Sequence, residues 1–235
     1  MLARLVLFAL TASALALAAA PDDCLLVIAQ PAPLNIDPTG KSFTLTMTNN
    51  CGKDITAYQV WFRDDSGQHI SGFAEERLAI LAIPEDIRSA NMDIFRAGAT
   101  WSGGSGSSDR WTSVSATAVW YADMTTAGDA EDISELIKSR REMVIRYKKE
   151  LDILGSYDTY ASAKKLPQDA AEAKAKNSPT YADLSHLAAQ FSRCDETSWK
   201  AFVQFQKRYT EDLISLFEAA VAAQDASGQQ KTEVQ

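Results

Sequence analysis

The stretch from Phe43 to Gly67, FTLTMTNNCGKDITAYQVWFRDDSG, decides the fold class of this chain. In its first part, apolar residues alternate with threonines, which is the period-two pattern of a half-buried antiparallel strand. Asn49 to Gly52 supplies turn residues, and Ile55 to Arg63 is then rich in β-branched and aromatic residues. Asp64 to Gly67 forms a second turn, after which Gln68 to Phe73 can return as the partner strand of a hairpin.

The same stretch resembles secreted bacterial immunoglobulin-like sandwiches, and more narrowly domains of the FxLYD type. Those families show a strand, an Asn-rich turn with Gly and Lys, and a second strand that ends in aromatic-x-Asp before a Gly turn. The resemblance implies an immunoglobulin-like fold and carries no catalytic residue over, because such modules are usually spacers or binding domains. The matching positions are Asn49, Asn50, Gly52, Lys53, Ile55, Tyr58, Val60, Phe62, Asp64 and Gly67.

Further strands extend the period-two pattern from Cys24 to Thr125. Leu25 to Ala29 is a short buried run, and Trp111 to Tyr121 is the last clear strand. We expect the Gly- and Ser-rich run from Gly103 to Ser108 to form a long loop between two strands. Short strands separated by turns favour a sandwich over a parallel sheet. In the last strand, alternation places four residues on one face, namely Val114, Ala116, Ala118 and Trp120.

After Asp123 the apolar period becomes helical. Asp129 is a candidate N-cap, and the following apolar residues keep a three-four spacing that is broken at Arg140. Ser178 with Pro179 predicts another helix start, and a last long helix is expected from about Ser198 to Gln224. Residues 155–177 fit either a weak helix or a mobile connection.

The expected fold is therefore α+β with segregated parts, an N-terminal antiparallel immunoglobulin-like β-sandwich followed by a C-terminal α-helical segment. The predicted organisation is a signal peptide over 1–20, the sandwich over 21–125, a helical hairpin or small bundle over 126–225 and a flexible tail over 226–235.

The first twenty residues have the pattern of a secretory signal peptide. Arg4 supplies the positive charge, Leu5 to Leu17 is mostly apolar, and small residues near Ala18 suit a signal peptidase. The alternative is a retained N-terminal anchor, but the apolar run is short for a span, which needs about 20 residues. We expect a secreted or periplasmic protein of the bacterial envelope or secretome, without a transmembrane segment in the mature chain.

Charge and cysteine usage fit that expectation. The net charge of −8 argues against sequence-independent binding of nucleic acid, which needs clustered basic residues. A disulfide between Cys24 and Cys51 is favoured in an exported protein, and two buried free thiols are the alternative. Cys194 is then left over, either as a buried thiol or as a site of intermolecular pairing.

Candidate catalytic residues are few. Asp183 lies three residues before His186 on a predicted helix, so the two side chains can share a face, as a general base and its carboxylate would. A surface polar cluster is the more common meaning of such a pair. Ser162 and Lys165 match Ser-x-x-Lys without the further elements that would support it. We expect no metal site and no cofactor.

An aromatic patch is the other candidate site. Alternation along the strand turns Trp61 away from its neighbours Val60 and Phe62. Trp61 therefore either packs under the helical segment or joins Tyr121 in an exposed patch that binds carbohydrate or protein.

The sequence favours an exported, non-enzymatic binding or structural protein, because the fold signal is positive and no catalytic constellation rises above chance. The alternative is an envelope hydrolase whose site is assembled from residues distant in sequence. The expected partners are an unidentified protein or a polysaccharide, with self-association through the C-terminal helices as a further option.

Overall fold

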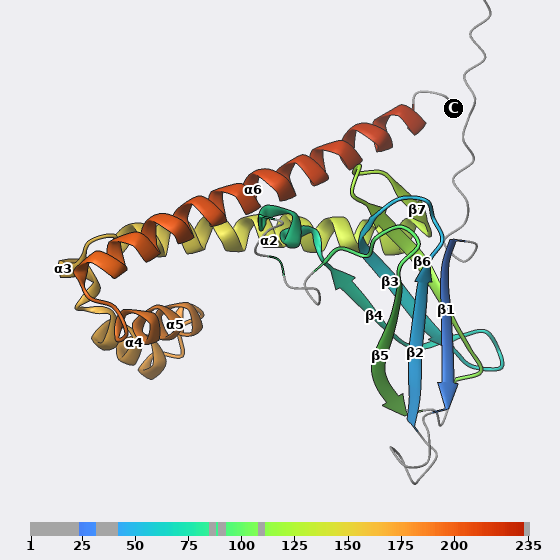
Figure 1. Ribbon diagram of the computed structural model, residues 1–235, viewed down its shortest axis with the longest axis horizontal. Helices are drawn as coiled ribbons and strands as arrows, with labels where there is room; N and C mark the ends of the chain where they lie inside the picture. The colour runs from blue at the N-terminus through green and yellow to red at the C-terminus, as the bar shows by residue number, and fades with distance from the viewer. Residues whose placement is uncertain (1–23, 32–41, 85–87, 89–92, 108–110, 233–235) are drawn as a thin grey trace, which may run out of the picture.

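The computed structural model of the chain describes residues 24–31, 42–84, 88, 93–107 and 111–232. They form two antiparallel β-sheets followed by helices (Figure 1), which confirms the predicted segregation of strands before helices. The predicted signal peptide lies outside the described residues.

Each sheet is built from short strands that pair antiparallel with their neighbours. The first sheet has the order β1 (Leu25–Pro31), β2 (Ser42–Asn49) and β5 (Thr100–Ser107). The second sheet has the order β4 (His69–Glu76), β3 (Ile55–Arg63), β6 (Ser113–Tyr121) and β7 (Thr126–Gly128), so it continues past the boundary expected at residue 125.

The two sheets enclose one apolar core. The alternating residues predicted to face inwards do so, and Leu45 and Met47 of β2 meet Val60 and Phe62 of β3 in that core. Cys24 and Cys51 form the predicted disulfide beside it, with 4.4 Å between their Cα atoms. The first sheet is therefore linked covalently to the turn that leads into the second.

The face of β6 changes partway along the strand, contrary to the expected simple alternation. Ala116 pairs with Val60 and Ala118 with Gln59, so Thr117 is an extra residue in the ladder. Such a bulge reverses which face the following side chains occupy. Of the four residues expected on one face, Val114 and Ala116 lie in the sandwich core and Trp120 lies beneath the helices, while Ala118 is buried but belongs to neither cluster.

The Gly- and Ser-rich run is a strand and not the expected loop. Residues 103–107 belong to β5, whose backbone pairs with β2. The lack of a side chain at Gly103 leaves space for an indole ring, because a Cβ there would lie 2.9 Å from Cζ2 of Trp101. Gly103 therefore permits the close approach of the Trp101 ring to the backbone of this strand.

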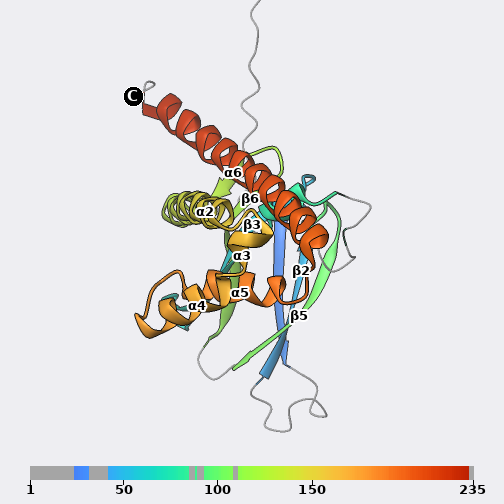
Figure 2. The same cartoon turned by 90° about the vertical axis from the view of Figure 1, so that its left-hand side faces the viewer.

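Two long helices form a hairpin that extends from the sandwich. Helix α2 (Ala130–Ser156) leaves the sandwich and α6 (Glu196–Thr232) returns towards it (Figures 1 and 2). At 1.5 Å per residue they are roughly 40 and 55 Å long. The predicted N-cap of α2 is confirmed, since Asp129 accepts hydrogen bonds from the backbone of Glu131 and Asp132. The helical backbone of α6 continues to Thr232, into the segment where a flexible tail was expected from residue 226.

Three shorter helices connect the distal ends of the hairpin: α3 (Tyr160–Ala163), α4 (Leu166–Ala175) and α5 (Tyr181–Phe191). We call residues 157–195, which contain them, the helical head. Of the two possibilities for residues 155–177, a weak helix or a mobile connection, the structure shows helices, α3 and α4. Helix α5 begins three residues after Ser178, whose hydroxyl contacts that of Thr180 at 2.8 Å instead of capping the helix.

The hairpin is fixed to one side of the sandwich. The first turns of α2 bring Leu136 onto Ala57 and Trp120, on the outer face of the second sheet. A short 3₁₀ helix, η1 (Leu78–Ala82), places Leu78 against Phe217 of α6. Both long helices therefore contact the β region at one end, while the helical head lies at the other end (Figure 1).

Candidate functional site

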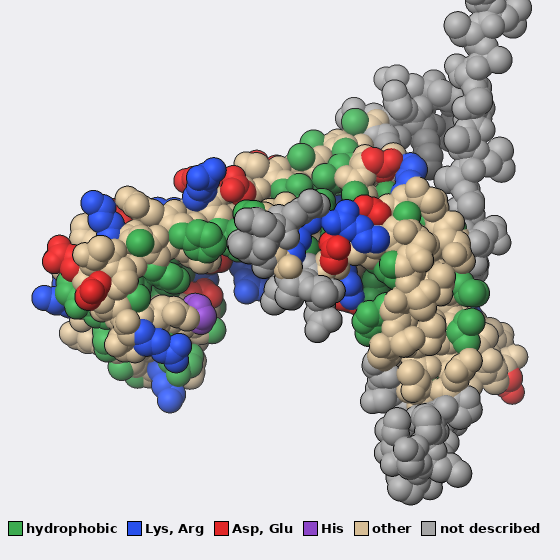
Figure 3. Space-filling view, viewed as in Figure 1, with side chains coloured by type: hydrophobic (Ala, Val, Ile, Leu, Met, Phe, Trp, Pro, Cys, Tyr) green, Lys and Arg blue, Asp and Glu red, His purple; other side chains and the backbone are tan. Residues whose placement is uncertain are grey.

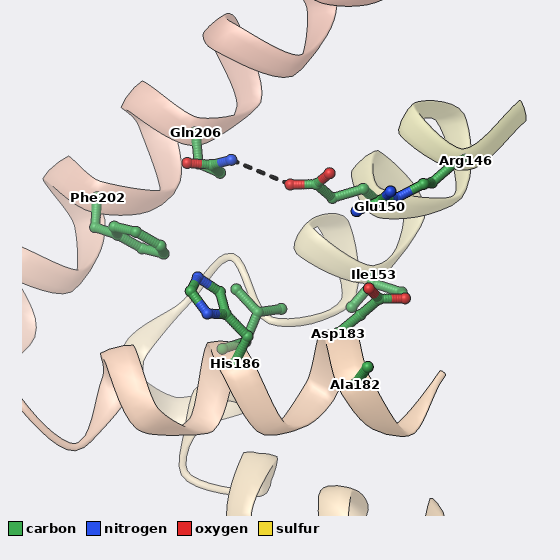
Figure 4. A pocket seen from close by; sticks show the side chains of 9 residues that line it. Arg146, Glu150, Ile153, Ala182, Asp183, His186, Phe202 and Gln206 are labelled. Atoms are coloured by element: carbon green, nitrogen blue, oxygen red, sulfur yellow. Dashed lines mark hydrogen bonds between the residues drawn. The ribbon is translucent and has the colours of Figure 1, made fainter. Parts of the chain in front are cut away.

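The strongest candidate site is a pocket of about 390 Å³ where α5 lies beneath the hairpin (Figure 4). Helices α2, α5 and α6 each contribute to its wall, and in Figure 4 the side chains of α5 point up towards the two long helices. The lining residues are Arg146, Glu150, Ile153, Ala182, Asp183, His186, Leu187, Phe202 and Gln206.

Helical spacing explains why these side chains meet. Residues three or four apart share one face of a helix. Arg146 and Glu150 are therefore neighbours on α2, as are Asp183 and His186 on α5 and the pair Phe202 and Gln206 on α6.

The apolar core of the head holds the three helices at this spacing. Trp199 of α6 is fully buried against Leu154 of α2 and Leu187 of α5. Its indole nitrogen donates to the backbone oxygen of Tyr157 at 3.0 Å, which satisfies the polar atom of the buried ring. The buried apolar core of the head thus fixes the positions of the three helices that line the pocket.

The ionisable side chains of this pocket have few partners within the protein. Gln206 Nε2 donates to Glu150 Oε1 at 3.1 Å, which fixes one carboxylate (Figure 4). In the described part of the chain, Arg146, Asp183 and His186 make no hydrogen bond and no ion pair. Unpartnered groups of this kind are free to meet a ligand.

Neighbouring charges on the same two long helices are paired. Lys148 Nζ of α2 lies 2.7 Å from Glu218 Oε1 of α6. Likewise, Arg141 Nη2 of α2 lies 2.7 Å from Asp225 Oδ1 of α6. The pocket thus differs from these two places on the hairpin, where opposite charges of the two helices meet in ion pairs.

The chemistry available in the pocket is binding and acid–base chemistry. Carboxylates, a guanidinium, an imidazole and an amide line it, together with one large apolar side chain from each of the three helices, Ile153, Leu187 and Phe202. No Ser, Thr, Cys, Tyr or Lys is among its described lining residues, so a covalent nucleophile there could only be a carboxylate or the imidazole of His186. Within the described residues, no group of three or more His, Cys, Asp or Glu side chains could hold a metal ion.

The structure thus brings Asp183 and His186 into one pocket, as their spacing suggested, but no hydrogen bond joins them. Sequence reasoning missed Arg146, Glu150, Phe202 and the other residues of the long helices. Their amphipathic spacing was visible, but no local pattern indicated which turn of each helix faces α5.

In the Ser-x-x-Lys pair, Ser162 has a structural role. Ser162 and Thr159 form a capping box at the start of α3, with 3.1 Å between Ser162 N and Thr159 Oγ1. Ser162 Oγ also donates to Thr159 O at 2.9 Å, and Lys165 is exposed. The serine hydroxyl is therefore engaged in helix capping.

Trp61 and Tyr121 do not form a common patch. Trp61 donates its indole N–H to Asp132 of α2 at 3.1 Å, and its ring stacks on His69 with 4.8 Å between centroids. Tyr121 is only 7% exposed and packs in the sandwich core, with its hydroxyl 3.5 Å from Cys24 Sγ. The structure thus shows the alternative arrangement for Trp61, contact with the helical segment.

No family model matches the chain, and no curated protein or solved structure is significantly similar to it. None of the helices in the described part of the chain combines the length and hydrophobicity needed to cross a bilayer.

Proposed function

We propose that this protein is an exported, non-enzymatic binding protein in which an immunoglobulin-like sandwich carries a helical arm with a ligand-binding head. The Cys24–Cys51 disulfide supports an oxidising compartment, which is where such bonds persist. The signal-peptide pattern of the first twenty residues supports export, and the two antiparallel sheets support the sandwich resemblance.

One observation carries the proposal. The head pocket presents Arg146, Asp183 and His186 without partners among the described residues, yet no hydroxyl, thiol or amine nucleophile is among its described lining residues. A hydrolase of the serine or cysteine type needs such a nucleophile within hydrogen-bond reach of its base. A binding site needs a few polar groups placed among apolar surface, and the pocket has both.

The architecture fits a binding role as well. Figure 3 shows the molecule hollowed beneath the hairpin, between the head and the sandwich. The long helices thus separate two potential contact regions by most of their length, as a spacer between a support and a ligand would.

The second candidate is a hydrolase that works by acid–base chemistry alone. It is favoured by one observation, that the pocket gathers Glu150 with the sequence-distant Asp183 and His186. Two carboxyl groups can activate a water and protonate a leaving group without a covalent step.

Affinity capture decides between the two. The tagged full chain, expressed with its own leader, is purified from the cell envelope beside the variant Asp183→Asn and the control Arg141→Gln, whose arginine lies outside the pocket. We expect one stoichiometric bound species with the natural protein and the control, and its loss with Asp183→Asn. Absence of any bound species contradicts the proposal. Turnover of ester, peptide or glycoside substrates that Glu150→Gln abolishes would instead establish the hydrolase.

A further inference from the structure

We infer that the head pocket binds a small zwitterion, a free α-amino acid with an apolar side chain. The inference rests on the proposed binding function and adds a ligand class to it. It follows from the two signs of unpaired charge that line one pocket together with apolar side chains.

The opposite charges in the pocket do not neutralise one another. Arg146 of α2 and Asp183 of α5 both line it, yet no ion pair joins them. Elsewhere on the hairpin, opposite charges across α2 and α6 lie within 2.7 Å, as in the pair Lys148 and Glu218. A ligand that carries both charges can form an ion pair with each of these two side chains at once.

The carboxylate of the ligand is assigned to Arg146. A guanidinium presents its N–H groups as a planar fork that matches the two oxygens of a carboxylate. Arg146 is exposed on α2 and has no acceptor among the described residues, so its donors are available.

The ammonium group of the ligand is assigned to the two carboxylates, Asp183 and Glu150. An ammonium has three N–H donors and no acceptor, so two acid groups on facing helices suit it. Gln206 already donates to Glu150 at 3.1 Å and therefore fixes the position of that carboxylate before the ligand arrives. Pre-ordering of this kind lowers the entropic cost of binding.

The apolar lining of the pocket receives the side chain of the ligand. Ile153, Leu187 and Phe202 form it, and Leu187 is buried, while Ile153 and Phe202 are half-buried. The volume of about 390 Å³ lies in the range of sites for small ligands. A leucine- or phenylalanine-sized side chain would cover these surfaces and exclude water from them.

The test is calorimetric titration of the full chain with L-leucine and with two analogues that each lack one charge. N-acetyl-L-leucine has no ammonium, and L-leucinamide has no carboxylate. We expect each analogue to bind about tenfold or more weakly than leucine, because a charge-assisted contact is lost. Leucyl-leucine distinguishes a free amino acid from a short peptide, since both carry one ammonium and one carboxylate. We expect it to bind more weakly than leucine, because its charges lie further apart.

Variants assign the two ends of the ligand. Arg146→Gln should remove the preference for leucine over leucinamide. The double variant Asp183→Asn with Glu150→Gln should remove the preference for leucine over N-acetyl-leucine. The control Arg141→Gln, outside the pocket on the same helix, should leave both preferences intact. Circular dichroism checks that each variant is folded.

Three outcomes overturn the inference: no heat with leucine or phenylalanine at millimolar concentration, equal binding of the blocked analogues, or selectivity that survives both pocket variants. Tighter binding of leucyl-leucine than of leucine would overturn the free amino acid as the ligand. A chain that binds no amino acid but still captures a partner would retain the proposed function and lose only this ligand class.

Discussion

The buried guanidinium of Arg140 in α2 donates two hydrogen bonds to the carboxylate of Glu76 in β4. Nε lies 2.7 Å from Oε2, and Nη2 lies 3.3 Å from Oε1. The guanidinium carbon also lies 4.9 Å above the ring of Trp120, and the arginine is only 1% exposed. This buried pair joins the helical arm to the second sheet.

Replacing this arginine should strongly destabilise the fold. In Arg140→Met, the aliphatic volume is largely kept, but Glu76, whose side chain is 12% exposed, loses its counter-charge. Removing one partner of a buried pair typically costs about 3–5 kcal/mol. The free energy of unfolding in urea measures the effect.

The matched control is Arg141→Met, because Arg141 makes an exposed pair with Asp225 in which both side chains are more than half exposed. Pairs of that kind contribute about 0–1 kcal/mol. If both variants lost equally little stability, the Arg140–Glu76 pair would not be what fixes the arm to the sandwich.

Gly72 is required for the placement of Trp61. A Cβ at this position would lie 2.4 Å from Cε3 of Trp61 and 2.7 Å from the backbone oxygen of Val60. Gly72→Ala should therefore force the indole away from Asp132 and cost about 1–3 kcal/mol, the usual range for overpacking.

Gly155 provides the comparison, since nothing lies within 4 Å of a Cβ added there and the residue is helical. Gly155→Ala should be neutral or stabilise by up to about 1 kcal/mol. Thermal unfolding followed by tryptophan fluorescence reports both changes. An unchanged spectrum and stability in Gly72→Ala would show that the indole does not need this close approach.

The disulfide should contribute substantially to stability. It joins residues separated by 27 positions, and closing a loop of that length stabilises by roughly 3 kcal/mol in the chain-entropy model. The double variant Cys24→Ser with Cys51→Ser should lower the unfolding free energy by about that amount, and reductant should have no further effect on it.

Cys194→Ser is the control, because that thiol is unpaired and half-buried in the head. Its unfolding curve should keep the sensitivity to reductant. Non-reducing peptide mapping that joined Cys194 to either other cysteine would contradict this arrangement.

Tyr157 should make the head sensitive to alkaline pH. Burial, together with the hydrogen bond from its hydroxyl to Asp169 at 2.7 Å, raises the pKa of Tyr157 to about 12 from an ordinary 10.0. Because the folded pKa is raised, the stabilisation is complete below pH 10 and is lost as pH rises through about 12.

A near-ultraviolet titration can detect this phenol. The Tyr157→Phe variant should lack one group that titrates near pH 12 in the natural chain, and its stability deficit should shrink as the pH rises through that range. Asp169→Asn keeps a hydrogen-bond acceptor without the charge, so it should lower the pKa of Tyr157 towards the ordinary value. An alkaline titration identical in Tyr157→Phe and the natural chain would exclude this assignment.

Local patterns predicted much of the fold. The alternation of β2 and β3, the hairpin after Asp64 and the N-cap at Asp129 are each encoded within a few neighbouring residues, and each is confirmed. Where local signals were wrong, tertiary contacts are the reason. The Gly- and Ser-rich run becomes a strand because β2 offers it a partner, and the bulge at Thr117 moves Trp120 to the face that α2 covers.

The sequence by itself determined the segregation of strands and helices, because the apolar period is a property of consecutive residues. It also indicated Arg140 as a charge at an apolar position, without its partner Glu76. Only the tertiary structure decided that Asp183 and His186 face Glu150 and Arg146. Their proximity depends on the relative axial position and rotation of α2, α5 and α6, which are set by the packing of their apolar side chains. No single segment of the chain encodes that relative placement.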